Sequence, residues 1–151
     1  MIAAIRAHNR LLSVFQNRRW DADFLTVRKA IEQGKIGDLF QIEMAWMASA
    51  PPRTWRGESV HGGGKFVDFG AHMIDQALLL IPAPVERVYA RFHADILDND
   101  VDDHAHCVIT FAGGVDVHIT TSSCATQVKP RWLGAPRAFS DNRALIRRKR
   151  P

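Results

Sequence analysis

At 151 residues, with 46% hydrophobic and 24% charged side chains, the chain has the size and composition of one folded domain with its own core, which excludes intrinsic disorder. The formal net charge of +4 does not indicate a nucleic-acid-binding protein, because the excess arises in the last nine residues and nothing upstream supplies a recognition helix or a stacking platform. The basic residues of this tail are Arg143, Arg147, Arg148, Lys149 and Arg150.

Nothing in the sequence indicates a membrane or secretory protein. The longest apolar runs, such as residues 77–81, are far too short to cross a bilayer, and the N-terminus lacks the pattern of a signal peptide. Cys107 and Cys124 fit neither a metal-ligand spacing nor a disulfide framework, as is expected of reduced thiols. We therefore expect a cytoplasmic location and no membrane contact.

The first 20 residues have the pattern of the end of an open α/β sheet. Residues 1–9 predict the end of a helix and residues 11–15 a short buried strand. Polar and cationic side chains follow at the carboxyl end of this strand, where open α/β sheets bind ligands. Asn17, Arg18 and Arg19 are therefore candidate cofactor-binding residues.

The next segment predicts a helix followed by a half-buried strand. Asp21 or Asp23 caps the helix, apolar residues recur at helical spacing, and Gly34 provides the C-cap. Alternation over residues 39–47 then predicts a strand with one face on the core. The expected core-facing residues are Phe24, Val27 and Ile31 of the helix, and Phe40, Ile42, Met44 and Trp46 of the strand.

Residues 49–61 are predicted to form a loop that leads into three adjacent glycines, residues 62–64. Trp55 in this loop either belongs to the core or, beside Arg56, walls a ligand pocket. Adjacent glycines carry a large backbone-entropy penalty. A chain tolerates this penalty where the main chain turns sharply or where a ligand approaches closely.

The helix that follows the glycines carries the candidate chemistry. Asp68 and His72 are four residues apart and share one helical face, with Asp75 one turn further on, while residues 76–81 become apolar. A histidine beside a carboxylate has its charged form favoured and its ring held, as general acid–base chemistry near neutral pH requires. The alternative for the same spacing is a solvated helix pair.

The remaining sequence predicts a strand at residues 88–92 and a hairpin at residues 103–123. A three-residue loop at 112–114 sets the core-facing side chains opposite one another: Cys107 with Ile119, Ile109 with Val117, and Phe111 with Val115. The opposite face then carries His104, His106 and His118, which either bind a metal or form a polar or subunit-contact face. We expect the second and predict no metal site.

Taken together, these motifs resemble the glucose-fructose oxidoreductase, inositol dehydrogenase and rhizopine catabolism (Gfo/Idh/MocA) family over about residues 1–132. The resemblance rests on the order and spacing of the motifs rather than on one of them. The Asn-Arg-Arg-Trp-Asp pattern at residues 17–21 is similar to the scyllo-inositol dehydrogenase-like branch. The matching residues are 16–24, 34–37, Gly62 to Gly64, Asp68, His72 and Asp75.

The resemblance implies an α+β fold with an open, largely antiparallel sheet and helices on one face, preceded by the last strand of a missing Rossmann domain. It divides the chain into a nucleotide-binding remnant at residues 1–20, a substrate and oligomerisation domain at 21–132, and a basic tail at 133–151. The tail departs from the family pattern, because the family continues into another sheet strand whereas residues 135–151 are arginine-rich and lack alternation.

The resemblance also implies an NAD(P)-dependent oxidoreductase of a sugar or an inositol-like polyol. In this reading His72 handles the proton of the substrate hydroxyl, Asp68 orients His72, and Asp75, Trp55 and Arg56 contact the substrate. The family's glycine-rich dinucleotide fingerprint and its Glu-Lys-Pro motif have no counterpart in this sequence. We therefore expect this chain alone not to bind NAD or NADP tightly and to be inactive by itself.

Two other functional classes remain open from the sequence. One is a non-catalytic binding or assembly module built on the open sheet, and the other is a nicotinamide-independent hydrolase or isomerase that uses Asp68 and His72. The open sheet face is expected to form a homo-oligomer contact that weakens below about pH 6, as its histidines become charged. This face carries Glu43, Tyr89, Arg91, His106 and His118.

Overall fold

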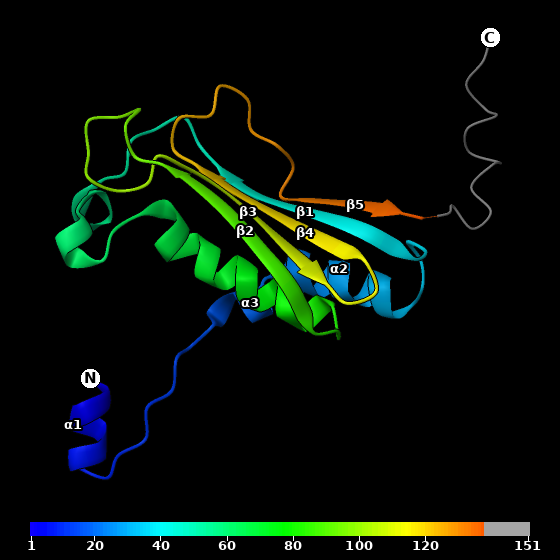
Figure 1. Ribbon diagram of the computed structural model, residues 1–151, viewed down its shortest axis with the longest axis horizontal. Helices are drawn as coiled ribbons and strands as arrows, with labels where there is room; N and C mark the ends of the chain where they lie inside the picture. Colours follow the sequence, from blue (N-terminus) through cyan, green and yellow to red (C-terminus); the bar gives the residue numbers. More distant parts are fainter. Residues whose placement is uncertain (138–151) are drawn as a thin grey trace.

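The computed structural model describes residues 1–137 and contains an open five-stranded sheet (Figure 1). Within these residues β1 and β4 pair in parallel, and the other three strand pairs are antiparallel. The order across the sheet is β2-β3-β4-β1-β5. The strands are β1 (Leu39–Met47), β2 (Val85–His93), β3 (His104–Phe111), β4 (Val115–Ser122) and β5 (Trp132–Pro136).

Two helices, α2 (Ala22–Glu32) and α3 (Ala71–Leu80), lie along the same face of this sheet, and the core fills the space between them and the strands (Figure 1). The expected α+β fold, with an open and largely antiparallel sheet covered on one face, is confirmed. Across residues 1–137 no helix is both long enough and apolar enough to span a membrane. Large buried core side chains are Phe24, Met44, Met73, Phe111 and Ile119.

The end of α2 and the hairpin follow the sequence pattern. The C-cap of α2 is Gln33, and Gly34, expected at this position, follows it in the left-handed conformation with a φ of +65° and donates its amide to the Ile31 carbonyl. The β3–β4 hairpin has the predicted register, which pairs Ile109 with Val117 across the ladder. This register places Cys107, Ile109 and Phe111 of β3 on the core, and the histidines together with Val108 on the open face.

The start of β1 differs from the sequence prediction. A register shift lies between Leu39 and Gln41, where β1 pairs with β5. Such a β-bulge reverses the alternation of side chains. Leu39 therefore packs against the core, whereas Phe40, expected on the core face, is 39% exposed.

The prediction of a strand at residues 11–15 is wrong. This segment has no regular secondary structure, Leu11, Val14 and Phe15 are exposed, and it extends away from the sheet after α1 (Ile2–Ala7) (Figure 1). A strand requires a neighbour to satisfy its backbone hydrogen bonds, and no strand in residues 1–137 pairs with this segment.

The sheet extends further along the chain than the sequence predicted, because it includes β5. This strand pairs antiparallel with β1 and continues through Pro136, so the boundary expected at residue 132 falls on its first residue. The sheet therefore has five strands rather than the four that alternation predicted. The basic residues of the predicted tail, from Arg143 to Arg150, lie outside the described residues.

Candidate functional site

The three glycines allow the chain to pack closely on two preceding 3₁₀ turns, η2 (Thr54–Gly57) and η3 (Ser59–His61). A Cβ atom on Gly63 would lie only 2.6 to 2.7 Å from three backbone carbonyl oxygens of this region. These oxygens belong to Trp55, Arg56 and Glu58. Gly64 has a φ of +115°, which side-chain-bearing residues rarely adopt. Of the two roles expected for the glycines, the structure shows the sharp turn.

The helix after the glycines begins as a π-helical turn, η4 (Phe66–Gly70), and continues as α3, so it is not regular throughout as expected. A Cβ atom on Gly70 would lie 2.8 Å from the Phe66 ring, so the turn depends on a glycine at that position. Asp68 lies in the π turn and His72 in the first turn of α3. π turns are rare and frequently occur at functional sites.

Three of the residues singled out by sequence meet at this turn. The Arg56 guanidinium donates a 2.8 Å hydrogen bond from Nε to the Asp68 carboxylate. The same guanidinium lies 4.5 Å from the centre of the Trp55 ring, which is a cation–π contact. Trp55 is 43% exposed and is therefore not a core residue, but it is not among the residues that line the cavity beside Asp68.

His72 lies one helical turn beyond this pair. Its side chain is partly buried, and its Nδ1 atom is buried without a hydrogen-bond partner in the described part of the chain. No hydrogen bond joins His72 to Asp68 there, and the Asp68 carboxylate is instead paired with Arg56. A buried polar atom without a partner requires an explanation, and a role in binding or catalysis is one of the established explanations.

Asp75 is paired with Arg19. The Arg19 guanidinium donates two hydrogen bonds, of 2.7 and 2.6 Å, to the two oxygens of the Asp75 carboxylate. The hydrogen bonds and the charge of Asp75 raise the pKa of Arg19. A predicted substrate contact and a predicted cofactor contact therefore lie side by side, and they join the segment 17–20 to α3.

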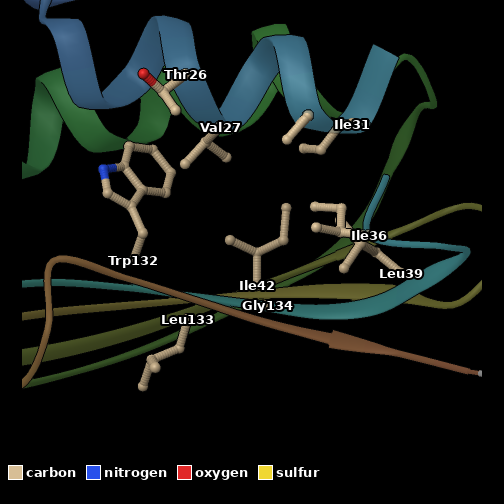
Figure 2. Close-up of a pocket in the computed structure, with 10 residues that line it drawn as sticks. Thr26, Val27, Ile31, Ile36, Leu39, Ile42, Trp132, Leu133 and Gly134 are labelled. Carbon is tan, nitrogen blue, oxygen red and sulfur yellow. The ribbon is translucent and has the colours of Figure 1, made fainter. Parts of the chain in front are cut away.

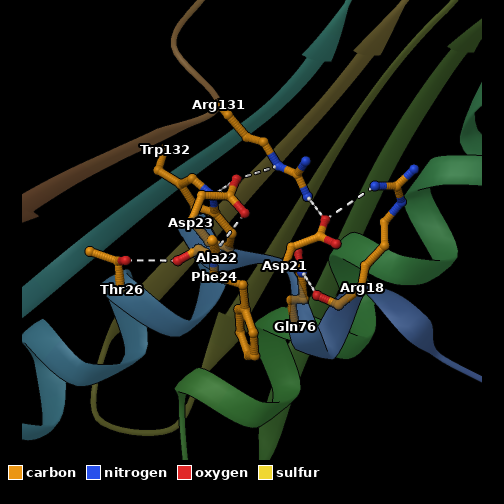
Figure 3. A network of polar contacts seen from close by, with 9 residues as sticks. All are labelled: Arg18, Asp21, Ala22, Asp23, Phe24, Thr26, Gln76, Arg131 and Trp132. Atoms are coloured by element: carbon orange, nitrogen blue, oxygen red, sulfur yellow. Dashed lines mark hydrogen bonds and ion pairs between the residues drawn. The ribbon is translucent and has the colours of Figure 1, made fainter.

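Arg18 belongs to a network that fixes the entry to α2 (Figure 3). Its guanidinium lies 4.4 Å from the centre of the Trp46 ring and donates a 3.1 Å hydrogen bond to Asp21. Arg131 lies 4.2 Å from the same ring and also pairs with Asp21. The backbone carbonyl of Arg18 accepts a 2.7 Å hydrogen bond from buried Gln76. Asn17 begins the adjacent 3₁₀ turn, η1 (Asn17–Trp20).

The sequence analysis missed an acidic loop that holds this site in place. Asp100 accepts hydrogen bonds from the amide and the hydroxyl of Ser59, at 2.9 and 2.6 Å. Asp102 accepts a 2.9 Å hydrogen bond from the Phe66 amide at the start of the π turn. Asp103 is fully buried and accepts from two loop amides and an asparagine side chain. The signal was present as the run of acidic residues at 98–103.

A cavity of 160 Å³ opens beside the π turn. Asp68, Arg56 and Lys65 provide its charged lining, and Pro51, Pro52 and Phe69 are among its apolar walls. Lys65 was not singled out by sequence. Burial lowers the pKa of its ammonium, an effect that the charge of Asp102 partly opposes. Polar and charged groups therefore converge on a small pocket at the open end of the helix.

A larger cavity, of 240 Å³, lies between α2 and the strands β1 and β5 (Figure 2). Its lining is largely aliphatic and aromatic, and Val27, Ile31, Ile42 and Trp132 point into it. The hydroxyl of Thr26, also in the lining, already donates a 2.7 Å hydrogen bond to the Ala22 carbonyl. This cavity offers no acid–base group and is poorly suited to a polyol.

The open face of the sheet carries the predicted histidines. His106 and His118 lie with ring centres 5.6 Å apart, and His93 lies 6.1 Å from His104. Burial and the neighbouring imidazoles lower the pKa of His104 and His106. In residues 1–137 no group of three or more histidine, cysteine or acidic side chains is arranged to hold a metal ion.

Comparisons with known proteins agree with this architecture. Residues 24–140 match a family model described as the GFO/IDH/MocA C-terminal domain. The chain is 34% identical over 103 residues to the scyllo-inositol 2-dehydrogenase (NADP(+)) IolW of Bacillus subtilis. It is 32% identical over 121 residues to the inositol 2-dehydrogenase of Rhizobium meliloti. These alignments cover 67% and 76% of this chain but only 28% and 36% of the two relatives.

Among solved structures, an NAD-binding protein from Listeria innocua superposes with a TM-score of 0.79 at 34% identity. The match covers 90% of this chain and 39% of that chain. The fold, including the helix that follows the three glycines, therefore matches the C-terminal domain of an oxidoreductase. The chain belongs to the GFO/IDH/MocA family.

Proposed function

We propose that this chain is the substrate-binding and oligomerisation part of an NAD(P)-dependent oxidoreductase that acts on a sugar or an inositol-like polyol. Two relatives named for inositol oxidation support the substrate class. The observation that carries the proposal is His72, whose buried Nδ1 has no partner in the described residues and which lies one turn from the Arg56–Asp68 pair.

His72 is the proposed acid–base group. An imidazole accepts the proton of a substrate hydroxyl on oxidation and returns it on reduction, since its ordinary pKa lies near neutrality. Asp68 acts in this proposal together with Arg56, because their hydrogen bond fixes both side chains at the edge of the cavity. Trp55, stacked on Arg56, would form the outer wall.

Asp75 is the remaining proposed substrate contact. Its carboxylate is held by Arg19, which leaves lone pairs available to accept hydrogen bonds from substrate hydroxyls. The arrangement gives less support to a hydrolase or isomerase built on an Asp68–His72 dyad, because no hydrogen bond joins these two side chains in residues 1–137.

The described residues do not fit a complete dinucleotide site. The guanidiniums proposed for cofactor contact are already paired, Arg18 with Asp21 and Arg19 with Asp75, and the sequence contains no glycine-rich phosphate-binding fingerprint. A bound nicotinamide supplies hydride transfer in such enzymes. We propose that another part of the protein binds most of it, with residues 17–19 at the periphery.

The open face of the sheet is the proposed contact between copies of this chain. The described helices α2 and α3 cover only the opposite face. Tyr89, Arg91 and His106 form part of a polar surface that crosses neighbouring strands, as partly polar subunit contacts do. A cytoplasmic location completes the proposal, supported by two cysteines that are both free thiols.

Titration of NADH and NADPH into the purified chain tests the proposal that another part of the protein binds most of the cofactor. Intrinsic nicotinamide fluorescence should show no saturable binding at micromolar protein. Binding at micromolar affinity or tighter by this chain alone would contradict the proposal that another part of the protein holds the cofactor.

A further inference from the structure

Lys65 places a half-buried positive charge in the 160 Å³ cavity. Its Nζ atom donates a 2.6 Å hydrogen bond to the backbone carbonyl of Ser122, at the end of β4. This bond uses one of the three donors of an ammonium group and holds the charge in one place. The family comparison and the sequence patterns assign no role to this residue.

The charge of Lys65 has no ion-pair partner within residues 1–137. Asp102 is a neighbouring carboxylate that acts on it through space, but that carboxylate accepts the Phe66 amide hydrogen bond. Burial raises the pKa of Asp102, an effect that hydrogen bonds from the backbone amides of Phe66 and Lys65 oppose.

The other two charged groups of the cavity neutralise each other. Arg56 and Asp68 form a direct ion pair of 2.8 Å. The lining therefore carries two cations and one carboxylate, and Lys65 supplies the excess positive charge. Partial burial strengthens the attraction of such a charge for an anion relative to water.

We propose that Lys65 is the specificity-determining cation of a carboxylate subsite, so that the preferred ligand of this pocket is an acidic sugar rather than a neutral polyol. This inference rests on the proposed function, because it assumes that the cavity receives the substrate. A carboxylate on a sugar carbon accepts hydrogen bonds from the free donors of Lys65. The sugar hydroxyls then face Asp68 and Arg56, which line the same cavity.

D-glucuronate and D-glucose form a matched pair of probes, because they differ only in a carboxylate in place of a hydroxymethyl group. Binding to the purified chain is measured by calorimetry or by amide chemical shifts. We expect glucuronate to bind about tenfold or more tightly than glucose, since a charge-assisted hydrogen bond is stronger than a neutral one. Added salt should reduce this preference.

Variants separate the charge of Lys65 from its structural bond to Ser122. Lys65→Met should abolish the preference, and Lys65→Arg should retain it. Lys129→Met is the matched control, because it removes an exposed lysine that pairs with Glu43 outside the cavity. If Lys65→Met fails to fold, the Lys65→Arg variant and the salt dependence still show whether the charge of Lys65 causes the preference for glucuronate.

Several outcomes would overturn the inference. These are equal binding of the two sugars, a preference unchanged in Lys65→Met, no binding of either sugar, or tighter binding of glucose 6-phosphate, which would indicate a phosphate subsite. The proposed function is tested separately by turnover in a full-length relative altered at the position of His72. If the relative altered at the position of His72 loses turnover, but this chain shows no preference for glucuronate, the carboxylate subsite alone is rejected.

Discussion

The Arg56 guanidinium and the Asp68 carboxylate are joined by a hydrogen bond of 2.8 Å across the glycine turn. The pair connects the 3₁₀ turn that carries Trp55 to the π turn that precedes α3. Both side chains are partly exposed, so the pair adds little to stability. Its position at the cavity edge instead favours a role in substrate contact.

Asp68→Asn should therefore affect chemistry more than folding. In a full-length relative, the substitution at this position should lower turnover about tenfold or more and change the unfolding free energy by less than about 0.5 kcal/mol. Steady-state kinetics and urea unfolding measure the two effects. Glu32→Gln is the control, because it breaks an exposed 2.8 Å pair with Arg28 and should change neither. A variant with lost stability and normal turnover would contradict this role.

Gly63→Ala should destabilise the chain. The new methyl group would lie 2.6 to 2.7 Å from three backbone carbonyl oxygens, and overpacking of this kind costs about 1 to 3 kcal/mol. Thermal unfolding measures the loss. Gly57→Ala is the matched control, because its nearest neighbour, at 3.4 Å, allows ordinary contact. Equal melting temperatures for the two variants would show that the turn relaxes without strain.

Asp103 should make folding sensitive to acid. Burial alone would raise the pKa of this carboxyl, but hydrogen bonds from Leu97, Asn99 and Ile96 together lower it. The carboxylate thus contributes stability that is present above its ordinary unfolded pKa of about 3.9 and is lost as the pH falls through the lower folded value.

Urea unfolding between pH 7 and pH 2 measures this contribution. Wild type should lose more stability below about pH 4 than Asp103→Asn, which cannot titrate at this position. Asp38→Asn, at an exposed site, should follow wild type. Parallel pH profiles for wild type and Asp103→Asn would remove Asp103 as a source of acid sensitivity.

Association through the open sheet face should weaken at mildly acid pH. Burial, followed by the neighbouring charges of His118, His104 and Lys129, lowers the pKa of His106, whereas Glu43 opposes this shift. Arg91 lies opposite His106 in the β2–β3 ladder and adds positive charge. Because the pKa of His106 is lowered in the folded chain, the stability of folding that neutral His106 supports is lost as the pH falls below about 6.5. Protonated histidines on two copies of this face would in addition repel each other across a symmetric contact.

Sedimentation velocity at pH 7.5 and pH 5.5 measures the association. We expect an oligomer at the higher pH and a shift toward monomer at the lower one. A double variant, His106→Gln with His118→Gln, should reduce this pH dependence, whereas His8→Gln in α1, far along the chain from the face, should not. A chain that is monomeric at both pH values at micromolar concentration would contradict the proposed contact.

The parts of the fold that the sequence predicted are those determined by local alternation. The register of β3 and β4 follows from which side chains must face the core, so Cys107 opposite Ile119 was predictable. The helix α3, which carries His72, was predictable from its sequence pattern, but the π turn that contains Asp68 was not. The bulge at Leu39 was not, because it depends on pairing with β5, which lies more than 90 residues further along the chain.

The polar partners of the site were also beyond local pattern. Sequence placed Asp68 beside His72, but tertiary contacts pair Asp68 with Arg56 and Asp75 with Arg19. Such pairs depend on how η1, η2 and α3 pack together. The spacing of residues within one helix gives no information on this packing. The π turn likewise depends on the contact between Gly70 and the Phe66 ring.

His72→Ala in a full-length relative, at the equivalent position, tests the central claim most directly. Turnover with sugar or polyol should fall about a hundredfold or more. His61→Ala is the control, because this exposed histidine pairs only with Glu58 in the described residues. Loss of turnover with an unchanged melting temperature would support His72 as the acid–base group. Normal turnover, or a changed melting temperature with turnover intact, would contradict it.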